Sequence, residues 1–308
     1  MRRRTYLLLV AAVGLSAPAL AIWTDPVPVS EINTPYHDKA PFPSFDGLTL
    51  YFTRQSTPES RYTRIYQATR SIPEGPFTSV EQISTLNSAY GHTDYPWVSR
   101  DNLRMYYYTQ DSRDWKCRLI STQRASTSDT WLPGVEVVEL NALGDVFNPS
   151  LTPDELTIFF GGDHLAGGLG GYDLWMATRP DSHSPFGNVT NLTELNSTAW
   201  DFHPAISPDA LTIYFGSRRN GISQLFTATR ESVAEPFGSP ERLRFFDLPG
   251  NALEYPTPSS DGMALYFTRS INGGQFDIYV SYIPEPGTLL LLGIGAVMLW
   301  NKRSQGTA

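Results

Sequence analysis

Acidic and histidine side chains stand just ahead of a proline at five places in this chain, and their types could support chemistry. A carboxylate lies two to four residues before each of these prolines, and a histidine accompanies it at three of them. Carboxylate and imidazole groups bind cations such as zinc or manganese, and paired carboxylates hydrolyse glycosidic bonds. The candidates for a ligand-binding face are therefore Asp94, Asp201, His203, Glu254, His37, Asp38 and His92, with Asp145 as the fifth acid.

Two interpretations of these acids remain open. An acid that recurs in every repeat can cap free backbone amides at the start of a strand, which is a structural role. Alternatively, the acids can bind a cation or sugar hydroxyls where the repeats converge. Histidines that are merely hydrogen-bonded are the simpler expectation, because the His–Asp pairs are far apart in sequence. No cofactor is expected and the metal is unknown, although a divalent cation is compatible with these pairs.

The elements that must position these residues are five copies of one repeat. The best preserved copy, residues 204–215, reads Pro-Ala-Ile-Ser-Pro-Asp-Ala-Leu-Thr-Ile-Tyr-Phe. The other copies occupy residues 41–52, 96–107, 149–160 and 256–267. Equivalent turn aspartates are spaced by 52 to 55 residues, so one supersecondary unit is stacked five times; they are Asp46, Asp101, Asp154, Asp209 and Asp261.

Each repeat predicts four antiparallel strands. The aspartate beside Ser, Thr or Pro indicates a tight turn that joins the first two strands, and these aspartates are expected to be structural. A third strand follows, and in three copies a Pro-Phe segment leads toward a fourth. Candidates for the fourth strand are residues 82–86, 136–140, 189–195 and 241–246. Four short strands per unit are typical of one propeller blade.

The missing fourth strand of the last repeat stands ahead of the first repeat, at residues 27–32. There, Ile-Asn-Thr at 32–34 echoes Leu-Asn-Ser at 86–88 and at 195–197. We therefore predict an all-β, five-bladed β-propeller whose ring is closed by the N-terminal strand pairing with residues 276–281. Closure removes the exposed strand edges of an open array. The connections between blades and the candidate residues should share one face.

The repeat with its Ser-Pro-Asp turn and Ile-Tyr-Phe strand resembles the WD-like repeats of TolB-type β-propellers. The resemblance spans about residues 27–282. It implies the propeller fold but specifies little about activity, because propellers carry many unrelated functions.

Both ends of the chain have the pattern of processing signals. Residues 1–21 combine a basic start, an apolar stretch and a small-residue cleavage site at Ala19 and Ala21, which predicts a signal peptide. Residues 284–308 begin with Pro284, Glu285 and Pro286, followed by an apolar stretch and a basic tail. This order resembles the PEP-CTERM sorting signal, which implies a short transmembrane helix and processing by an exosortase. The propeller would occupy residues 22–283.

Charge and cysteine content limit the partners of the exported body and the ways in which its fold can be stabilised. The net charge is −8, and removing both terminal segments would make the body more acidic. Nucleic acids and anionic lipid surfaces are poor partners for such a body, because they bind positive charge. Cys117 is the single cysteine, so the core must hold the fold without disulfides. We expect membrane anchoring at the cell envelope before processing, then release to the cell surface or extracellular matrix.

Two functions of different classes are compatible with these features. The first is a non-catalytic binding or scaffold module that holds exopolysaccharide or another protein on its loop-bearing face. The alternative is a glycoside hydrolase or lyase, because five-bladed propellers include such enzymes. Asp94, Asp201 and Glu254 would then supply the carboxylates. Against this alternative, catalytic acids usually break repeat symmetry, whereas these acids follow it.

Overall fold

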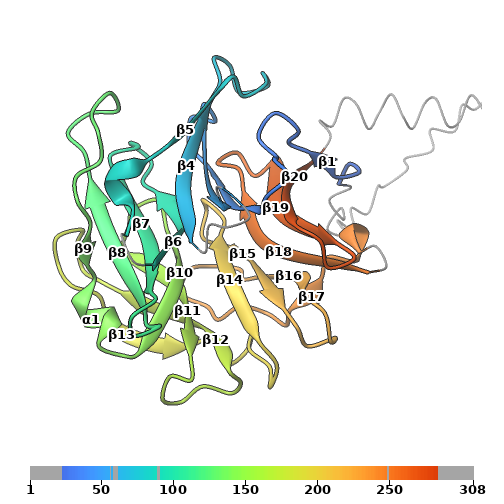
Figure 1. The fold of residues 1–308 in the computed structure, drawn as a ribbon. Helices are drawn as coiled ribbons and strands as arrows, with labels where there is room; N and C mark the ends of the chain where they lie inside the picture. Colours follow the sequence, from blue (N-terminus) through green and yellow to red (C-terminus); the bar gives the residue numbers. More distant parts are fainter. Residues whose placement is uncertain (1–22, 56, 58–61, 89–90, 248–249, 284–308) are drawn as a thin grey trace, which may run out of the picture. The chain divides into compact units, whose positions relative to one another are not determined.

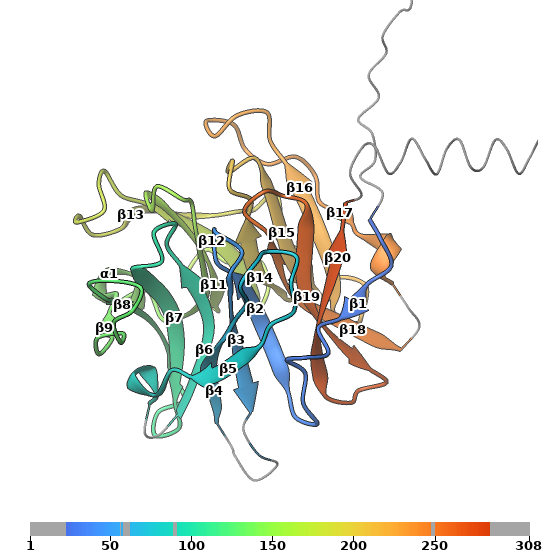
Figure 2. The same ribbon diagram turned by 90° about the horizontal axis from the view of Figure 1, so that it is seen from above.

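The chain folds into five antiparallel β-sheets arranged around a common axis, as seen in a computed structural model (Figures 1 and 2). The structure describes residues 23–283 except 56, 58–61, 89–90 and 248–249. Every sheet has four strands, and the first strands of neighbouring blades contact one another around the axis. The predicted all-β, five-bladed propeller is confirmed.

Four blades are built from consecutive strands. The first contains β2 (Asp38–Pro43), β3 (Thr49–Gln55), β4 (Thr63–Thr69) and β5 (Ser79–Gln82). The second contains β6 (Gly91–Val98), β7 (Arg104–Asp111), β8 (Cys117–Gln123) and β9 (Val135–Glu136). The third contains β10 (Asp145–Leu151), β11 (Thr157–Asp163), β12 (Tyr172–Thr178) and β13 (Gly187–Asn191). The fourth contains β14 (Asp201–Ile206), β15 (Thr212–Ser217), β16 (Gln224–Thr229) and β17 (Glu241–Arg242).

The fifth blade closes the ring with strands from both ends of the propeller. It contains β18 (Asn251–Pro258), β19 (Ala264–Ile271), β20 (Phe276–Tyr282) and β1 (Val27–Pro28). β1 pairs with β20, with Val27 opposite Val280 (Figure 1). Just beyond β1, the Asn33 side chain accepts a hydrogen bond from the Ile278 amide at 2.8 Å and donates to its carbonyl at 2.9 Å. The predicted closure by the N-terminal strand is therefore confirmed.

The outer strands are shorter than the sequence suggested. In three blades the fourth strand gives way to a helical turn: 3₁₀ turns at Ser84–Leu86 and Arg244–Phe246, and α1 at Val138–Asn141. Leu86, Leu140 and Phe246 on these turns are buried. A helical turn directs these large side chains into the core, whereas a strand continuing past them would place alternate residues on opposite faces.

The core lies between the blades, as expected from the aromatic second strands. Phe159 of the third blade packs with Phe215 of the fourth, and Phe160 packs with Trp97 of the second. Phe159, Phe160 and Phe215 are fully buried. Burying a phenylalanine contributes about 1.5–3 kcal/mol, so repeated aromatic pairs between neighbours hold the ring together.

The tight turn between the first and second strands is the same in every blade. In the fourth blade, Ser207 Oγ donates to Asp209 Oδ1, and the amide of Leu211 donates to the same oxygen at 3.0 Å. Ala210 between them has a left-handed φ of 61°. The same pair of hydrogen bonds is made by Asp46, Asp101, Asp154 and Asp261. These bonds confirm the structural role predicted for the turn aspartates.

An arginine after the third strand secures this turn in four blades, and the sequence analysis missed it. Arg179 Nε donates to the Glu155 carbonyl at 2.7 Å, and its guanidinium lies 4.3 Å from the ring centre of Phe186. The equivalent pairs are Arg70 with Phe77, Arg124 with Trp131, and Arg230 with Phe237. Cation–π contact and a turn carbonyl thus explain the recurring Pro-Phe segments.

The predicted targeting segments, residues 1–21 and 284–308, lie outside the described residues. Within the described part of the chain, no helix has the length and apolar character needed to cross a membrane.

Candidate ligand-binding site

The candidate residues gather at one end of the ring. We call this end the loop face; it carries the connections between blades and the loops between second and third strands. The opposite end, which carries the aspartate turns, is the turn face. All seven predicted candidates lie at the loop face, because each sits just before or early in a first strand.

The residue before the repeat's proline has an unusual backbone in all five blades. The first strand has a β-bulge at this point in each blade. The φ angles are 51° for Ala40, 57° for Tyr95, 55° for Asn148, 56° for His203 and 56° for Tyr255. Such left-handed angles are uncommon for residues other than glycine, and a bulge redirects a side chain. These five side chains therefore do not follow the regular alternation of side chains between the two faces of a strand.

Three of these side chains stack on one another across the axis. The ring centre of His203 lies 3.7 Å from that of Tyr255 and 5.7 Å from that of Tyr95. The Tyr95 hydroxyl donates to the Pro204 carbonyl at 3.2 Å. Burial, with the positive charges of Lys39 and Arg218, holds the pKa of His203 well below its usual value, so the imidazole is neutral. The stack joins the second, fourth and fifth blades.

Asp38 and Asp201 have matching structural surroundings in two blades. Asp38 is fully buried and bonds Arg54 Nε at 2.5 Å, while the amide of Thr34 donates to it at 2.7 Å. Asp201 is likewise buried and bonds Arg219 at 2.6 Å and the Ser197 amide at 2.6 Å. Both carboxylates therefore cap the chain segment that precedes the first strand.

Asp94 belongs to a buried cluster that differs from those two sites. Its carboxylate pairs with Lys39 Nζ at 2.7 Å and accepts hydrogen bonds from Thr63 Oγ1 and the Tyr95 amide. Burial opposes the charge on Lys39, but Asp94 and Tyr255 outweigh it and raise the pKa of the lysine. His92 accepts a hydrogen bond from the Thr63 amide at 3.2 Å. Asp94 and His92 together tie the second blade to the first.

The remaining acids and histidines also link neighbouring blades. Ser223 Oγ donates to Glu254 at 2.7 Å, the Cys117 amide donates to Asp145 at 2.7 Å, and the Phe276 amide donates to His37 at 3.1 Å. Each bond joins the start of a third strand to the next blade. The five acids before the repeat prolines are thus not equivalent: they form three kinds of site. All of them make hydrogen bonds that stabilise the fold.

The predicted His–Asp pairs are not brought into one cluster. The acids of these pairs have separate hydrogen-bond partners, each in its own blade or at its own blade junction. Within the described residues, no group of three His, Cys, Asp or Glu side chains is arranged to hold a metal ion.

A pocket of about 230 Å³ opens on the loop face beside the stacked rings. Its aromatic wall includes Tyr172 and Trp200, whose ring centres are 4.7 Å apart, and Arg218 lies 4.5 Å from the Trp200 ring centre. Burial raises the pKa of the Cys117 thiol in the wall to about 12, which keeps it protonated. The lining residues are Tyr108, Gln110, Cys117, Phe147, Asn148, Tyr172, Trp200, Phe202, His203, Arg218, Glu254 and Tyr255.

Two buried polar atoms in this lining have no hydrogen-bond partner. They are Asn148 Nδ2 and His203 Nδ1, on side chains that are 2% and 8% exposed. A buried polar atom without a partner costs about 1–3 kcal/mol, so pairing of either atom with a water or a ligand group is favoured. His203 and Glu254 were predicted from sequence as ligand-face residues, and both line the pocket. Asn148, Tyr172 and Trp200 were missed.

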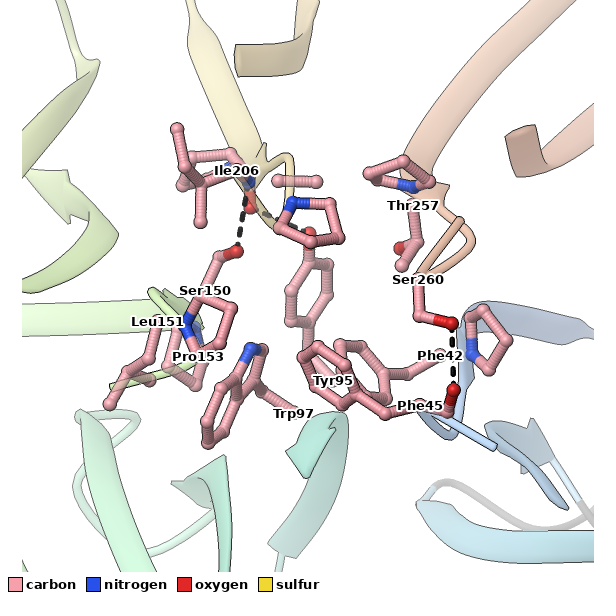
Figure 3. Close-up of a pocket in the computed structure, with 16 residues that line it drawn as sticks. Phe42, Phe45, Tyr95, Trp97, Ser150, Leu151, Pro153, Ile206, Thr257 and Ser260 are labelled. Atoms are coloured by element: carbon pink, nitrogen blue, oxygen red, sulfur yellow. Dashed lines mark hydrogen bonds between the residues drawn. The ribbon is translucent and has the colours of Figure 1, made fainter. Parts of the chain in front are cut away.

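The opposite end of the axis has a much smaller cavity, of about 30 Å³ (Figure 3). Trp97, Leu151 and Ile206 contribute to its apolar lining. Two of its hydroxyl groups are engaged: Ser150 Oγ accepts from the Ile206 amide at 3.0 Å and Ser260 Oγ donates to the Phe45 carbonyl at 2.7 Å. Tyr95 lines this cavity and also belongs to the stack, so the stacked rings separate the two cavities.

No protein-family model and no curated protein matches the sequence. Solved structures do share its fold. An endo-arabinase from Bacteroides thetaiotaomicron is 14% identical, with a TM-score of 0.56 over 84% of this chain and 96% of its own. A GH43_1 enzyme from Xanthomonas citri, solved with xylotriose, is 13% identical, with a TM-score of 0.56 over 83% and 88%. A protein described as a TolB of Agrobacterium tumefaciens is 16% identical, with a TM-score of 0.50 over 84% and 97%. These likenesses concern the fold alone.

Proposed function

We propose that this chain is a binding module that holds a saccharide or a protein segment in its loop-face pocket without cleaving it. The observation that carries the proposal is the composition of that pocket. It joins an aromatic wall to buried polar atoms that lack partners, and Glu254 is the single carboxylate among its described lining residues. Binding pockets typically combine apolar walls with a few placed polar groups.

The chemistry of this lining favours a saccharide. One face of a sugar ring carries C–H groups that pack on an aromatic face, while its hydroxyls both donate and accept hydrogen bonds. Tyr172 and Trp200 offer the aromatic surface, and Asn148 and His203 offer the polar atoms. Trp200 is 41% exposed, so an incoming ligand can reach it.

The alternative is a glycoside hydrolase, and two observations favour considering it. Glu254 lines the pocket, and structures of similar fold include an endo-arabinase and a GH43_1 enzyme. Hydrolysis of this kind needs two carboxyl groups that face the scissile bond, about 5–9.5 Å apart. Asp94 and Asp201 do not line the pocket and are bound to Lys39 and Arg219. This arrangement supports binding over cleavage.

The test is a glycan array probed with residues 22–283, run beside an assay for released reducing sugar. We expect binding to a subset of glycans and no release of reducing sugar above background. Release that increases with time and is lost in Glu254→Gln would replace the binding proposal with the hydrolase. Binding to no glycan would leave a protein segment as the ligand, to be sought by binding to isolated envelope proteins.

We also propose that the module is exported, anchored at the envelope and then processed at Pro284, Glu285 and Pro286 by an exosortase-type enzyme. The support is the sequence pattern of both ends. Intact mass of the exported protein, with and without replacement of this triplet by alanine, tests the proposal. Equal processing of both would contradict it.

A further inference from the structure

We propose that the loop-face pocket binds the terminal residue of a neutral saccharide, end-on, rather than an internal stretch of the chain. This inference rests on the proposed binding function and adds the class of ligand and its mode of entry. Three features of the described residues carry it: a closed floor, an aromatic wall at the entrance, and buried polar atoms that have no partner.

The floor is closed by the stacked side chains. His203 and Tyr255 line the pocket and stack at 3.7 Å between ring centres, and Tyr95 packs against both. Tyr95 and Tyr255 are 6% and 7% exposed. A polysaccharide therefore cannot pass through the axis to the turn face. A pocket closed at its end accommodates the end of a chain, whereas an internal stretch needs a cleft that is open at both sides.

The wall beside the entrance is aromatic, and its exposed part, on Trp200, is the surface on which a sugar ring would pack. Tyr172 and Trp200 come from neighbouring blades, and their ring planes are inclined by 33°. Arg218 lies against the Trp200 ring and 3.6 Å from Glu254 of the fifth blade. This ion pair holds the guanidinium against the indole. Trp200 lies in the connection before β14, so it stands where a ligand enters.

Two neutral polar atoms of the lining residues are buried without a partner, and each would pair with a hydroxyl once its side chain turns toward the pocket. Asn148 Nδ2 is a donor, and the neutral His203 ring offers Nδ1 as a donor or an acceptor depending on its tautomer. Glu254 accepts from Ser223 and faces Arg218, so its charge is already balanced. A pocket with balanced charge and unpartnered neutral groups favours an uncharged polyhydroxyl ligand over a carboxylated or phosphorylated one.

The mode of binding can be tested by competition and by chain length. The probes are linear oligosaccharides of glucose, mannose, xylose and arabinose, from one to six residues, titrated against residues 22–283 by calorimetry. End-on binding predicts that the matching free monosaccharide competes with the hexamer, and that affinity changes less than about threefold beyond two residues. Affinity that rises steadily with length, without competition by any monosaccharide, would overturn end-on binding while leaving the binding function standing.

Variants separate the pocket from the rest of the loop face. Trp200→Ala and Asn148→Asp should each weaken binding at least about tenfold, which is the effect of losing roughly one good contact. Trp115→Ala is the matched control, because Trp115 is 64% exposed on the same face and is not part of the pocket lining. Melting temperatures of all three variants identify any loss that comes from unfolding.

Two further outcomes would overturn the inference. One is binding that survives both pocket variants in folded protein, because the ligand would then sit elsewhere. The other is failure of every neutral oligosaccharide to bind, while a purified protein partner binds and is lost in Trp200→Ala. That second outcome would retain the pocket and the binding function but exclude the saccharide.

Discussion

The two ends of each blade differ in how closely they repeat. At the turn face, all five aspartates make the same pair of hydrogen bonds, and four arginines hold the same turn carbonyl. At the loop face, the five residues before the prolines share a backbone conformation but carry side chains as different as alanine, asparagine, histidine and tyrosine. Where repeats agree, the residue serves each blade. Where the repeats share a backbone conformation but differ in the side chain, the ring contains one asymmetric site, the loop-face pocket.

The largest expected effect is a loss of stability on removal of β1, the strand that closes the ring and so supports both the turn face and the loop face. Deleting residues 24–33 takes away β1, the buried side chains of Val29 and Ile32, and the Asn33 bridge to Ile278. Each buried aliphatic side chain contributes about 1.5–3 kcal/mol, so we expect a loss on the order of 5 kcal/mol and aggregation through the exposed edge of β20. Denaturation by urea and size-exclusion chromatography measure both.

The matched control for this deletion is the double variant Val27→Ala, Pro28→Ala. These residues pair with β20 but are exposed. The control should behave like the parent. A deleted protein that stays monomeric with an unchanged midpoint would contradict closure by β1.

A smaller effect is expected at the turn face, where stability but not binding should change. Arg179 is buried beside Glu155, which also bonds Arg104. Arg179→Ala should lower the free energy of unfolding by about 3 kcal/mol, because it removes one partner of a buried ion pair. Arg230→Ala removes the same carbonyl bond and aromatic contact where the turn residue is Ala210. Arg230→Ala should therefore lower the free energy of unfolding by less than Arg179→Ala does. The difference between the two losses measures the contribution of the Arg179–Glu155 ion pair.

Urea titrations of both arginine variants, with ligand titrations on the folded proteins, provide the measurement. Weakened ligand binding in either one would show that the two ends are not independent. Equal losses of stability would mean that the ion pair between Arg179 and Glu155 does not contribute to the free energy of unfolding.

The smallest expected effect is a pH dependence that belongs to the loop face. His203 is held neutral by burial, with Lys39 and Arg218 as the nearby cations and Tyr95 and Tyr255 against its ring. Its pKa is lowered on folding, so the unfolded chain takes up a proton first as pH falls below about 6.5. Stability is complete above that pH and decreases below it, by at most about 1.4 kcal/mol per pH unit for one group.

His203→Phe keeps a ring in the stack and removes the titrating group. The loss of stability between pH 7.5 and 5.5 should therefore be about 1 kcal/mol smaller in the variant than in the parent. Part of the slope should remain, since burial also lowers the pKa of His37 and His92. Urea unfolding at the two pH values measures the difference, and identical slopes would show that His203 is not buried neutral.

The sequence predicted the fold well because the fold depends on repetition. Five turn aspartates and five aromatic strands predict the same turn and the same buried strand in every blade. The fourth strand missing from the last repeat could be located by counting the strands. The helical turns after β5, β9 and β17 were missed because Leu86, Leu140 and Phe246 fit a strand pattern as well as a helical one.

The site was predicted only in part, for a physical reason. Asp94, Asp201 and Glu254 were chosen because carboxylates stand out in a sequence, yet all three are paired within the structure and only Glu254 also lines the pocket. Asn148 and Trp200 matter through a backbone bulge and through contacts between blades, which no spacing within one repeat reveals. A signal was present in hindsight: the position before the repeat's proline varies in chemistry while the proline itself is the same in all five copies.

Closure by β1 has a consequence for how the protein folds. Val27 meets Val280, so the last contact of the ring joins residues from nearly opposite ends of the propeller sequence. Contacts this distant in sequence carry a high entropic cost of loop closure and slow the folding of β-proteins. The ring cannot be completed until β20 has been synthesised, because β1 pairs with β20. Folding of this propeller is therefore expected to end with a slow step in which β1 and β20 pair and close the ring.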